Sequence, residues 1–535
     1  MHKMSKSLLV AVLICGLAVG FAAMGQEKML RSTFAWPTYA DPAVGSDYSS
    51  SSTLVNVYDS LVYPTLEGGV KPHLADVWEA TDDGLTWTFY LRKGINFHDG
   101  TELTAEDVVF SMDRMVTIGE GYGYLFTGRI DVGTTEAVDD YTVRFYLKEP
   151  FGPFLTNLVR LYVVNKDFVM ANLDDGPYDE YGDYGKKFLL TNDAGSGAYT
   201  IKEFPLESYV LMEKYPDYWG RNYVGMIEKE APDQLKFIAT TEAITVRTMM
   251  ANRELEISDQ WQTEEALATL DSIDGVDVAK YPSSGGFYYM LHNKKAPTDD
   301  IHFRKAMAYA FDYETAAGLF DSPPSQGPVA AGFPGWNPDV FAYTKDLAKA
   351  EEELQQSKYY AELDKYPVEL HWITEVPSEE KVALLFQANM AEIGVKVNVV
   401  RTPWLSVVDE MADIDASPNI VTVFVAPHYP EAGSILESRY HSNSAPTWEQ
   451  NEWLLDSDLD ARIEQAIKTT DIQERFNQYY DIQEYIVDLC PSLFLLDQMS
   501  KHAYQTYVDW PVVKGDVYSV MGYNFDARFI KILPH

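Results

Sequence analysis

The stretch LADVWEATDDGLTWTFYLRKGINFHDGTELTAEDVVF, residues 74–110, contains a strand, two turns and the start of a helix. Its apolar residues Leu85, Trp87, Phe89 and Leu91 alternate with Thr and Tyr. Alternation of this kind is the period of a strand that is buried on one face. The pattern therefore predicts a strand here, bounded by Asp-Gly turns on both sides.

Turn and capping signals follow this strand. Asp99-Gly100 marks a tight turn, because glycine accepts backbone angles that other residues avoid. Thr104 and Asp107 form a capping-box pattern ahead of an apolar run, which predicts the start of a helix. His98 precedes the turn, and no serine or cysteine nucleophile motif lies near it in the sequence. We expect His98 to hold the turn rather than to catalyse, although spacing alone leaves a distant nucleophile open.

Length and charge narrow the class of protein. The 535 residues exceed what one hydrophobic core usually serves, so we expect two or more lobes. Short predicted strands alternate with helices without a fixed repeat, which favours an α/β architecture. The formal net charge of −39 repels nucleic acid and anionic lipid, and leaves neutral or cationic partners.

The N-terminus has the pattern of a secretory signal peptide. Lys3 and Lys6 precede an apolar run over 8–24, and small residues follow where a signal peptidase would cut. The run is short for a membrane span. We predict a signal peptide over 1–25, export of the chain, and Gln26 as the first mature residue.

The two cysteines say little about chemistry. Cys15 raises a lipoprotein alternative, but the bulky Ile14 stands where such signals have a small residue. Cys490 is the only cysteine after the predicted cleavage site, so no intramolecular disulfide can form in the mature chain. We expect it to be a buried, inert thiol.

A search for catalytic and metal-binding motifs finds none of the common ones. The sequence lacks G-x-S-x-G, H-E-x-x-H, C-x-x-C and the phosphate-binding loop, and its ten histidines are scattered. The acidic segment 173–185 leaves a calcium site conceivable, although the EF-hand spacing is absent. By contrast, 36 Tyr, 25 Phe and 11 Trp suit a concave site lined with aromatic side chains.

Further elements are predicted in the second half of the chain. We expect strands at 287–291 and from Val395, helices over 301–320, from Ser378 to Ile393, over 459–467 and over 473–487, and strands and turns in the last forty residues.

The quoted stretch also resembles the signature of family 5 extracellular solute-binding proteins, the receptors of ABC importers for peptides, nickel and some oligosaccharides. Other segments resemble family motifs in the same order along the chain, and together they cover nearly all of the predicted mature protein. These segments are Gly195–Tyr199 (GSGAY), Tyr215–Gly220 (YPDYWG), His292–Pro297 with Arg304–Asp312, and Ile393–Val397 with Trp404.

The resemblance implies an α/β, two-lobed periplasmic-binding-protein fold (type II, cluster C), with an extra subdomain in the first lobe. By analogy the first lobe combines 26–65, 190–288 and 495–535. The extra subdomain is 66–189, and the second lobe is 289–494. His98 would then lie in the extra subdomain, away from the cleft between the lobes.

The resemblance also implies a function. The chain would be an exported receptor, periplasmic or otherwise associated with the cell envelope, which captures a short oligopeptide or oligosaccharide by lobe closure. It would deliver that ligand to an inner-membrane ABC permease with its ATPase, as a monomer, without a cofactor and without binding nucleic acid. A nickel or metal-chelate receptor of the same family is the alternative, and a secreted hydrolase is a further one.

The implied ligand-binding residues lie in segments that line the cleft in the family. Plain packing is the alternative role for each of them. They are Trp404 after the late strand, His428 and Tyr429 in the following loop, Trp448, Phe287 and Tyr288 where the chain crosses between lobes, and Ser49 and Ser50 before a first-lobe helix.

The nature of the ligand depends on a carboxylate. Peptide-binding relatives commonly hold the α-amino group with an acid in the loop that matches 424–431, because a buried ammonium needs a paired charge. Here that loop reads FVAPHYPE, and Pro427 stands about where the acid is expected. Glu431 or Asp409 could supply the charge instead. Without one, a neutral oligosaccharide stacked on aromatic side chains would fit better.

Overall fold

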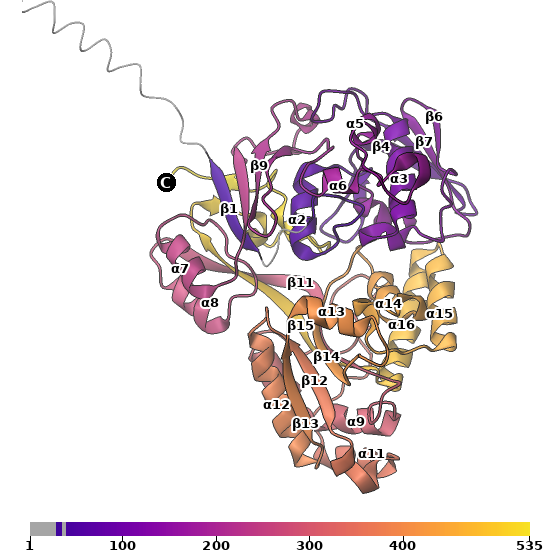
Figure 1. Ribbon diagram of the computed structural model, residues 1–535, viewed down its shortest axis with the longest axis vertical. Helices are drawn as coiled ribbons and strands as arrows, with labels where there is room; N and C mark the ends of the chain where they lie inside the picture. Colours follow the sequence, from indigo (N-terminus) through magenta and orange to yellow (C-terminus); the bar gives the residue numbers. More distant parts are fainter. Residues whose placement is uncertain (1–27, 35–38) are drawn as a thin grey trace, which may run out of the picture.

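The computed structural model describes residues 28–34 and 39–535, and the predicted signal peptide lies outside them. Two lobes lie one above the other along the long axis of the molecule (Figure 1). The long strands β11 (Val276–Leu291) and β15 (Ser492–Gln505) run between them. Among the described residues, no helix combines the length and apolar character needed to cross a bilayer.

The first lobe is built on a four-stranded sheet. Its order is β1-β10-β9-β8, with β1 parallel to β10 and the other pairs antiparallel. Helix α2 (Tyr48–Val57) lies beside this sheet (Figure 1). The strands are β1 (Met29–Phe34), β8 (Tyr199–Glu203), β9 (Tyr209–Lys214) and β10 (Gln234–Ala239).

A second four-stranded sheet, entirely antiparallel, falls within residues 66–189. Its order is β4-β5-β7-β6. The strand and the helix predicted from the quoted stretch are confirmed as β5 and α3, and the amide and hydroxyl of Thr104 both donate to Asp107 at 2.9 and 3.1 Å. The elements here are β4 (Ala75–Ala80), β5 (Thr86–Leu91), α3 (Ala105–Ile118), β6 (Glu136–Asp139), β7 (Thr142–Tyr146), α4 (Phe154–Asn157), α5 (Lys166–Met170) and α6 (Lys186–Leu189).

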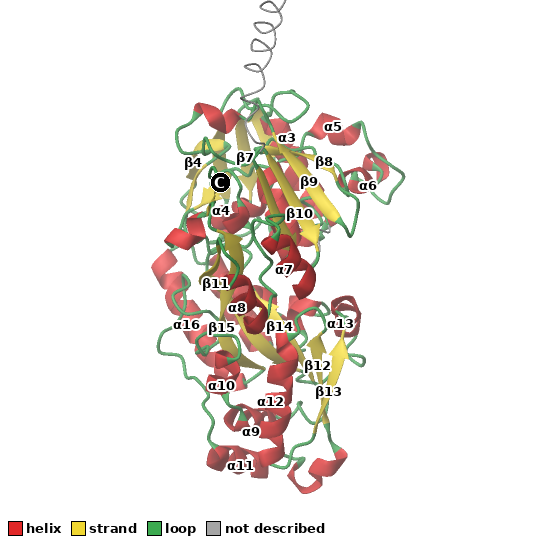
Figure 2. Ribbon diagram, turned by 90° about the vertical axis from the view of Figure 1, so that its left-hand side faces the viewer, coloured by secondary structure: helices red, strands yellow, loops and turns green. Residues whose placement is uncertain are grey.

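The second lobe contains a five-stranded mixed sheet in the order β13-β12-β14-β11-β15. The first three strands are parallel to one another, and β11 is antiparallel to both of its neighbours. The strands not yet given are β12 (Val368–Ile373), β13 (Val397–Thr402) and β14 (Ile420–Val425). Helices α9 (Ile301–Ala310), α10 (Tyr313–Gly318), α11 (Leu347–Gln356), α12 (Ser378–Glu392), α13 (Trp404–Met411), α14 (Gly433–Tyr440), α15 (Ser457–Lys468) and α16 (Ile472–Leu489) surround it (Figure 2).

The predicted helices of this lobe are present, although several of their bounds differ from the prediction. Residues 301–320 form two helices rather than one, because the side chain of Asp312 accepts from the amide of Thr315 at 3.0 Å and starts a new helix. The helix expected from Ser378 begins at that residue with Pro377 as the N-cap, so Ser378 is inside it. The two late helices are longer at both ends than their apolar patterns predicted.

The crossing strands change register where they pass between the lobes. The pairing of β11 with β15 is interrupted between Pro282 and Gly286. Ser284 there has a φ of 61°. A Cβ on Gly285 would lie 2.1 Å from the carbonyl oxygen of Val425, so only glycine lets the chain approach β14 this closely. Helices α7 (Ala243–Ala251) and α8 (Glu264–Asp271) pack near the first-lobe ends of these strands.

Two of the sequence motifs meet at a buried aspartate. Asp59 accepts hydrogen bonds from Ser196 of the GSGAY motif at 3.0 Å and from the indole of Trp219 of the YPDYWG motif at 2.7 Å. Gly195 and Gly197 have no room for a side chain, since a Cβ on either would clash with the backbone of Val57. These motifs therefore fasten the end of α2 to the sheet of the first lobe.

The lobes also touch away from the crossing strands. Helices α14 to α16 lie next to the 66–189 region (Figure 1). The guanidinium of Arg129 pairs with Glu437, and Lys468 pairs with Glu149 at 2.7 Å. The amide of Gly152 donates to the carbonyl of Ile467 at 2.7 Å. The structure therefore has the two lobes in contact around the cleft.

Candidate functional site: the cleft between the lobes

A cavity of about 240 Å³ lies between the lobes. Both lobes and both crossing strands contribute to its walls, so a molecule bound there would touch both lobes at once. From the first lobe and the crossing strands come Ser46, Asp47, Tyr48, Gln260, Trp261, Tyr281, Ser283, Gln498, Ser500, Tyr518, Met521, Gly522 and Asn524, and from the second lobe come Ile373, Glu375, Val376, Glu379, Trp404, Val423, Phe424, Val425, Ala426, His428 and Trp448.

The second-lobe wall follows from the topology of the sheet. Strands β12, β13 and β14 are parallel, so their carboxyl ends lie at one edge of the sheet. Glu375 and Glu379 follow β12, Trp404 follows β13 and His428 follows β14. Ligands of open α/β sheets bind outside the carboxyl ends of parallel strands. The cavity between the lobes lies at this edge of the second-lobe sheet.

Aromatic side chains form much of the wall. The rings of Trp404 and Trp448 meet edge to face at 5.2 Å, and the guanidinium of Arg439 lies 4.6 Å from the Trp448 ring. Across the cavity, Trp261 of the first lobe packs against Phe424 at 5.5 Å. These rings offer flat apolar surfaces for stacking and for cation–π contacts.

Two carboxylates of the second lobe reach the cavity. One oxygen of Glu379 accepts hydrogen bonds from the amide of Ile373 at 2.8 Å and from the hydroxyl of Thr422 at 2.5 Å. Burial raises the pKa of Glu379 to about 8, and the nearby charge of Glu375 adds to this. Glu375 accepts from the amide of Trp404 at 3.0 Å, which satisfies the first turn of α13.

The first lobe adds a third carboxylate. Asp47 is the N-cap of α2, and it accepts from the amide of Ser50 at 3.0 Å and from its hydroxyl at 2.6 Å. The serines predicted as ligand contacts, Ser49 and Ser50, are buried within α2 and are not among the lining residues. Ser46, Asp47 and Tyr48 line the cavity in their place, because the helix begins one residue before Ser49.

His428 lines the cavity and is almost completely buried. Its ring lies 5.7 Å from that of Tyr122 and 5.6 Å from that of Tyr124, so it is held against the 66–189 region. Nε2 is 3.5 Å from a carboxylate oxygen of Glu449. The carbonyl of His428 accepts from the guanidinium of Arg160 at 2.7 Å. The loop after β14 thus contacts both the ligand cavity and the opposite lobe.

Three other predicted contacts lie behind the walls. Phe287 is buried in the second-lobe core and stacks on the cavity residue Phe424 at 4.5 Å. Tyr288 points to the other face of β11, where its hydroxyl donates to the carbonyl of Pro328. Tyr429 is fully buried beside the helices that follow. Successive residues of a strand face opposite sides, and here neither face of β11 at 287–288 borders the cavity.

Neither carboxylate considered from the sequence reaches the cavity. Glu431 is buried in an ion pair with Arg475, at 2.9 and 3.0 Å, and also accepts from Tyr479 at 2.7 Å. Asp409 is exposed on α13. The acids that the sequence reasoning missed are Glu375, Glu379 and Asp47. The end of a parallel strand is a signal that could have pointed to Glu375.

The comparison with known families agrees with this geometry. The model of the bacterial extracellular solute-binding proteins, family 5, matches residues 69–446, which is more than half of the chain. The chain is a family 5 extracellular solute-binding protein. The members of this family are substrate-binding receptors rather than enzymes.

Relatives of this solute-binding protein are similar over almost their whole length. It is 25% identical over 504 residues to the probable D,D-dipeptide-binding periplasmic protein DdpA of Escherichia coli, covering 92% of each chain. A Helicobacter pylori periplasmic binding protein, DppA, solved with the peptide STSA, superposes with a TM-score of 0.80 at 21% identity over 95% and 98% of the two chains. Campylobacter jejuni NikZ, solved with Ni(L-His), gives a TM-score of 0.79 at 17% identity over 95% and 100%.

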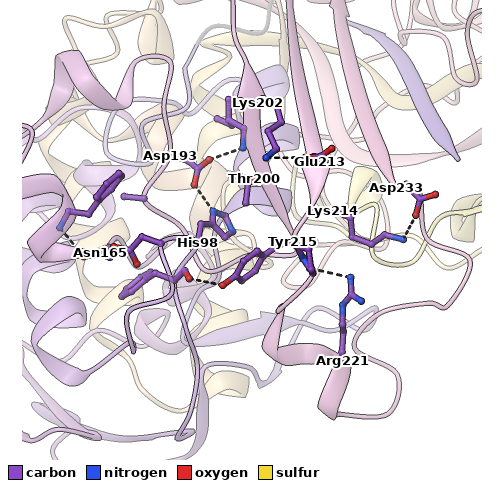
Figure 3. Close-up of a pocket in the computed structure, with 16 residues that line it drawn as sticks. His98, Asn165, Asp193, Thr200, Lys202, Glu213, Lys214, Tyr215, Arg221 and Asp233 are labelled. Atoms are coloured by element: carbon purple, nitrogen blue, oxygen red, sulfur yellow. Dashed lines mark hydrogen bonds and ion pairs between the residues drawn. The ribbon is translucent and has the colours of Figure 1, made fainter. Parts of the chain in front are cut away.

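The solute-binding protein has a second, larger pocket, here called the outer pocket, where the 66–189 region meets strands β8 and β9 of the first lobe (Figure 3). Its volume is about 830 Å³, and it contains His98. Its charged side chains pair mostly with each other: Lys202 with Glu213 at 2.9 Å, and Lys214 with Asp233 at 3.3 Å. The smaller cavity differs from this pocket in that it is lined by residues of both lobes.

His98 holds loops together in this outer pocket. Its Nδ1 lies 2.5 Å from a carboxylate oxygen of Asp193, and its Nε2 donates to the carbonyl of Gly197 at 3.0 Å. Burial lowers the pKa of the imidazole, but the charge of Asp193 outweighs it and the net pKa is raised. Both ring nitrogens are engaged in structural contacts, which agrees with the scaffold role expected for this residue.

In the acidic segment 173–185, the carboxylate of Asp183 accepts hydrogen bonds from backbone amides of the same region. Asp183 accepts from the amides of Asp174, Gly185 and Lys187 at 2.8 to 3.0 Å. Over residues 28–34 and 39–535, no group of three or more His, Cys, Asp or Glu side chains is arranged to hold a metal ion. Cys490, the remaining thiol, is buried, and burial raises its pKa to about 11.

Proposed function

We propose that this protein is exported and serves as the receptor of an ABC importer, capturing a short peptide by closure of its two lobes. The lobes would follow the division given above: 26–65, 190–288 and 495–535 with the 66–189 subdomain on one side, and 289–494 on the other. A membrane permease and its ATPase would receive the ligand from the monomeric receptor in the periplasm or at the cell envelope.

The observation that carries this proposal is the cavity walled by both lobes. A ligand there gains contacts that exist only when the lobes are together. Shifting a minor closed state to near-complete occupancy needs a difference on the order of 5 kcal/mol between the two states. Trp404, His428 and Trp448 are the predicted residues that we propose as ligand contacts, with Glu375 and Glu379 beside them.

The size of the cavity favours a short ligand. Its volume of about 240 Å³ is below the range of roughly 300–1,000 Å³ for common small-molecule pockets. A molecule of dipeptide size suits this space better than a long oligopeptide does. The names of relatives, including the dipeptide-binding protein of Escherichia coli, support the same ligand class.

The carboxylates favour a peptide over a neutral oligosaccharide. The sequence reasoning left the two open because no acid was found in the loop after β14. Glu375, Glu379 and Asp47 reach the cavity by other routes and can pair with an amino terminus. An oligosaccharide would use the aromatic walls but has no cationic group to offer Glu379, which has no cationic partner among the described residues.

A thermal-shift panel of di- to pentapeptides against short neutral glycans tests this proposal. A ligand at about a hundred times its dissociation constant stabilises the folded protein by about 2.7 kcal/mol. We expect stabilisation by dipeptides, weaker effects with growing length, and no effect of glycans. Stabilisation by glycans alone would refute the peptide proposal, and steady hydrolysis of any bound ligand would refute the receptor proposal.

A further inference from the structure

The charge of the cavity lining is one-sided. Asp47, Glu375 and Glu379 are its acidic residues, and no lysine or arginine is among its described lining residues. The one histidine among the described lining residues is His428, whose Nε2 lies 3.5 Å from a carboxylate oxygen of Glu449. Carboxylates come from both lobes, so the acidic character belongs to the whole cavity rather than to one wall.

Glu379 is the least compensated of these acids. Its side chain is almost fully buried, and the hydrogen bonds from Ile373 and Thr422 both go to Oε2. Oε1 has no hydrogen-bond partner in the described part of the chain, and no lysine, arginine or histidine there pairs with Glu379. Burial of an ionised carboxylate without a cation costs free energy. The pKa of about 8 reflects that cost.

The position of Glu379 prepares it for a charged partner. It lies in the first turn of α12, where the helix dipole stabilises a negative charge. Trp404, Trp448 and Trp261 provide the aromatic faces around it, and such faces attract ammonium and guanidinium groups. A cation entering the cavity therefore meets both a carboxylate and aromatic rings.

An anion would meet no comparable partner. The guanidinium of Arg439 lies 4.6 Å from the ring of the wall residue Trp448, and it is paired with Glu449 at 3.2 Å. It is almost completely buried and is not a lining residue. A ligand carboxylate in the cavity would face Glu375, Glu379 and Asp47 with no counter-charge.

We propose that the cleft selects a small cationic ligand that carries an ammonium or guanidinium group and no free carboxylate, with Glu379 as the principal counter-charge. The proposal rests on the receptor function given above and narrows its ligand class. A peptide with its carboxyl end blocked as an amide fits it, and an ordinary dipeptide with a free carboxylate fits less well.

The same charges link binding to closure. Asp47 on one lobe and Glu375 and Glu379 on the other line the same cavity, so at pH 8 and above, where Glu379 loses its proton, closure brings like charges together. Like charges disfavour approach, whereas a cation between them reverses the sign of the interaction. The closed state is then favoured over the open state mainly when a cation occupies the cavity. A ligand shifts the population toward the closed state only if it interacts more favourably with that state, and the cation does so.

Four related peptides separate the two charges of the ligand. Ala-Phe amide carries only the ammonium, Ala-Phe carries both charges, N-acetyl-Ala-Phe amide carries neither, and N-acetyl-Ala-Phe carries only the carboxylate. Calorimetric titration of the full-length mature protein measures all four at pH 8. We expect Ala-Phe amide to bind about tenfold more tightly than Ala-Phe, and both acetylated peptides to bind more weakly still.

Two neighbouring glutamates provide the variant and its control. Glu379→Gln keeps the size of the side chain and removes the charge, and it should lower the affinity for Ala-Phe amide about tenfold while leaving N-acetyl-Ala-Phe amide unchanged. Glu380→Gln removes an exposed charge from the next position of α12, outside the cavity, and should change neither affinity.

The outcomes distinguish this proposal from the receptor function. Equal or tighter binding of Ala-Phe than of its amide would overturn the charge selection and leave the peptide receptor standing. Unchanged affinity for the amide in both Glu375→Gln and Glu379→Gln would overturn it as well. Binding of a neutral glycan with no binding of the four peptides would overturn the peptide ligand itself.

Discussion

The two pockets of this protein differ in how their charges are compensated. In the outer pocket of the first lobe, Lys202 pairs with Glu213, Lys214 with Asp233, and His98 with Asp193. In the cleft between the lobes, Glu379 has no cationic partner among the described residues. The charges of the larger pocket pair with one another, whereas Glu379 in the smaller one has no cationic partner and holds its proton up to about pH 8.

This difference in charge compensation indicates which of the two pockets is suited to bind a charged ligand. A pocket whose ion pairs are complete gives a charged ligand little to gain, because binding would have to break an existing pair. In the cleft, Glu379 has no cation beside it among the described residues and holds its proton up to about pH 8, so a cationic ligand can gain free energy by forming an ion pair with this carboxyl group. Volume alone would point to the outer pocket, whereas charge compensation points to the cleft.

The largest expected effect is a loss of stability when an ion pair of the outer pocket is removed. Asp193→Asn removes the charge opposite the buried ring of His98, and we expect the free energy of unfolding to fall by about 3 kcal/mol. The pKa of His98 is raised in the folded protein, so the pair stabilises most below the unfolded histidine pKa of about 6.5 and its contribution is lost as pH rises through the folded value. The deficit of the variant should therefore be larger at pH 6 than at pH 9 in denaturant titrations.

Asp217→Asn, at an exposed position near this pocket, is the matched control and should leave stability unchanged. The affinity for ligand should be unchanged in both variants. If Asp193→Asn bound ligand tenfold more weakly at a temperature where the variant is folded, the outer pocket would take part in ligand binding. The contrast between the two pockets would then be wrong.

The next largest effect is a gain in stability, and it comes from a substitution in the cleft. The folded protein holds a proton on Glu379 up to about pH 8, whereas the unfolded chain releases it near pH 4.5. Stability contributed by this site therefore falls as pH rises from about 4.5 to about 8. Glu379→Gln does not titrate, so we expect the unliganded variant to be more stable than the parent at pH 8, by on the order of 2 kcal/mol.

Chemical denaturation at pH 5 and pH 8 checks this expectation. The two proteins should be similar at pH 5 and should differ at pH 8, and Glu380→Gln should follow the parent at both. A variant that is less stable than the parent at pH 8 would mean that Glu379 is compensated after all, and the contrast between the pockets would disappear.

The smallest of the three effects concerns the aromatic wall. Trp404→Ala removes the ring that packs on Trp448, and we expect the affinity for the best-binding peptide to fall by about 1.5 kcal/mol, roughly tenfold. Trp78→Ala removes a half-buried tryptophan from β4, far from the cleft, and should leave the affinity unchanged. Equal affinities of Trp404→Ala and the parent in calorimetric titration would mean that the carboxylates alone define the site.

Local elements of this fold could be predicted from the sequence, because their signals are local. The strand at β5 and the capped start of α3 follow from alternation and from Thr104 with Asp107, which are neighbours in the chain. The break at Asp312 was missed, since a capping aspartate inside an apolar pattern competes with the continuation of the helix. The partner of His98 was missed too, because Asp193 is distant in the sequence and adjacent only in space.

The cleft was predicted less completely than the fold. Trp404, His428 and Trp448 could be placed at it through the family resemblance. Phe287 and Tyr288 lie behind the walls of the cleft, because both faces of β11 at these residues are covered by hydrophobic core. The sequence at 287–288 does not show whether either face of the strand borders a cavity. Glu379 could not be found at all from its pattern, since a glutamate in the first turn of a helix is ordinarily a solvent-exposed residue.

The interrupted pairing of β11 and β15 has a mechanical consequence. A fully bonded ribbon is stiff, and rotation of one lobe against the other concentrates where the ladder is broken, between Pro282 and Gly286. Ser283 and Gln498 lie at that compliant joint and are hydrogen-bonded to each other at 3.0 Å. Because both also line the cavity between the lobes, we infer that a ligand bound there changes the torsional stiffness of this joint. Slower hydrogen exchange at residues 283–286 on ligand binding, with unchanged exchange in the flanking ladder, would be its signature, and a uniform change along both strands would contradict it.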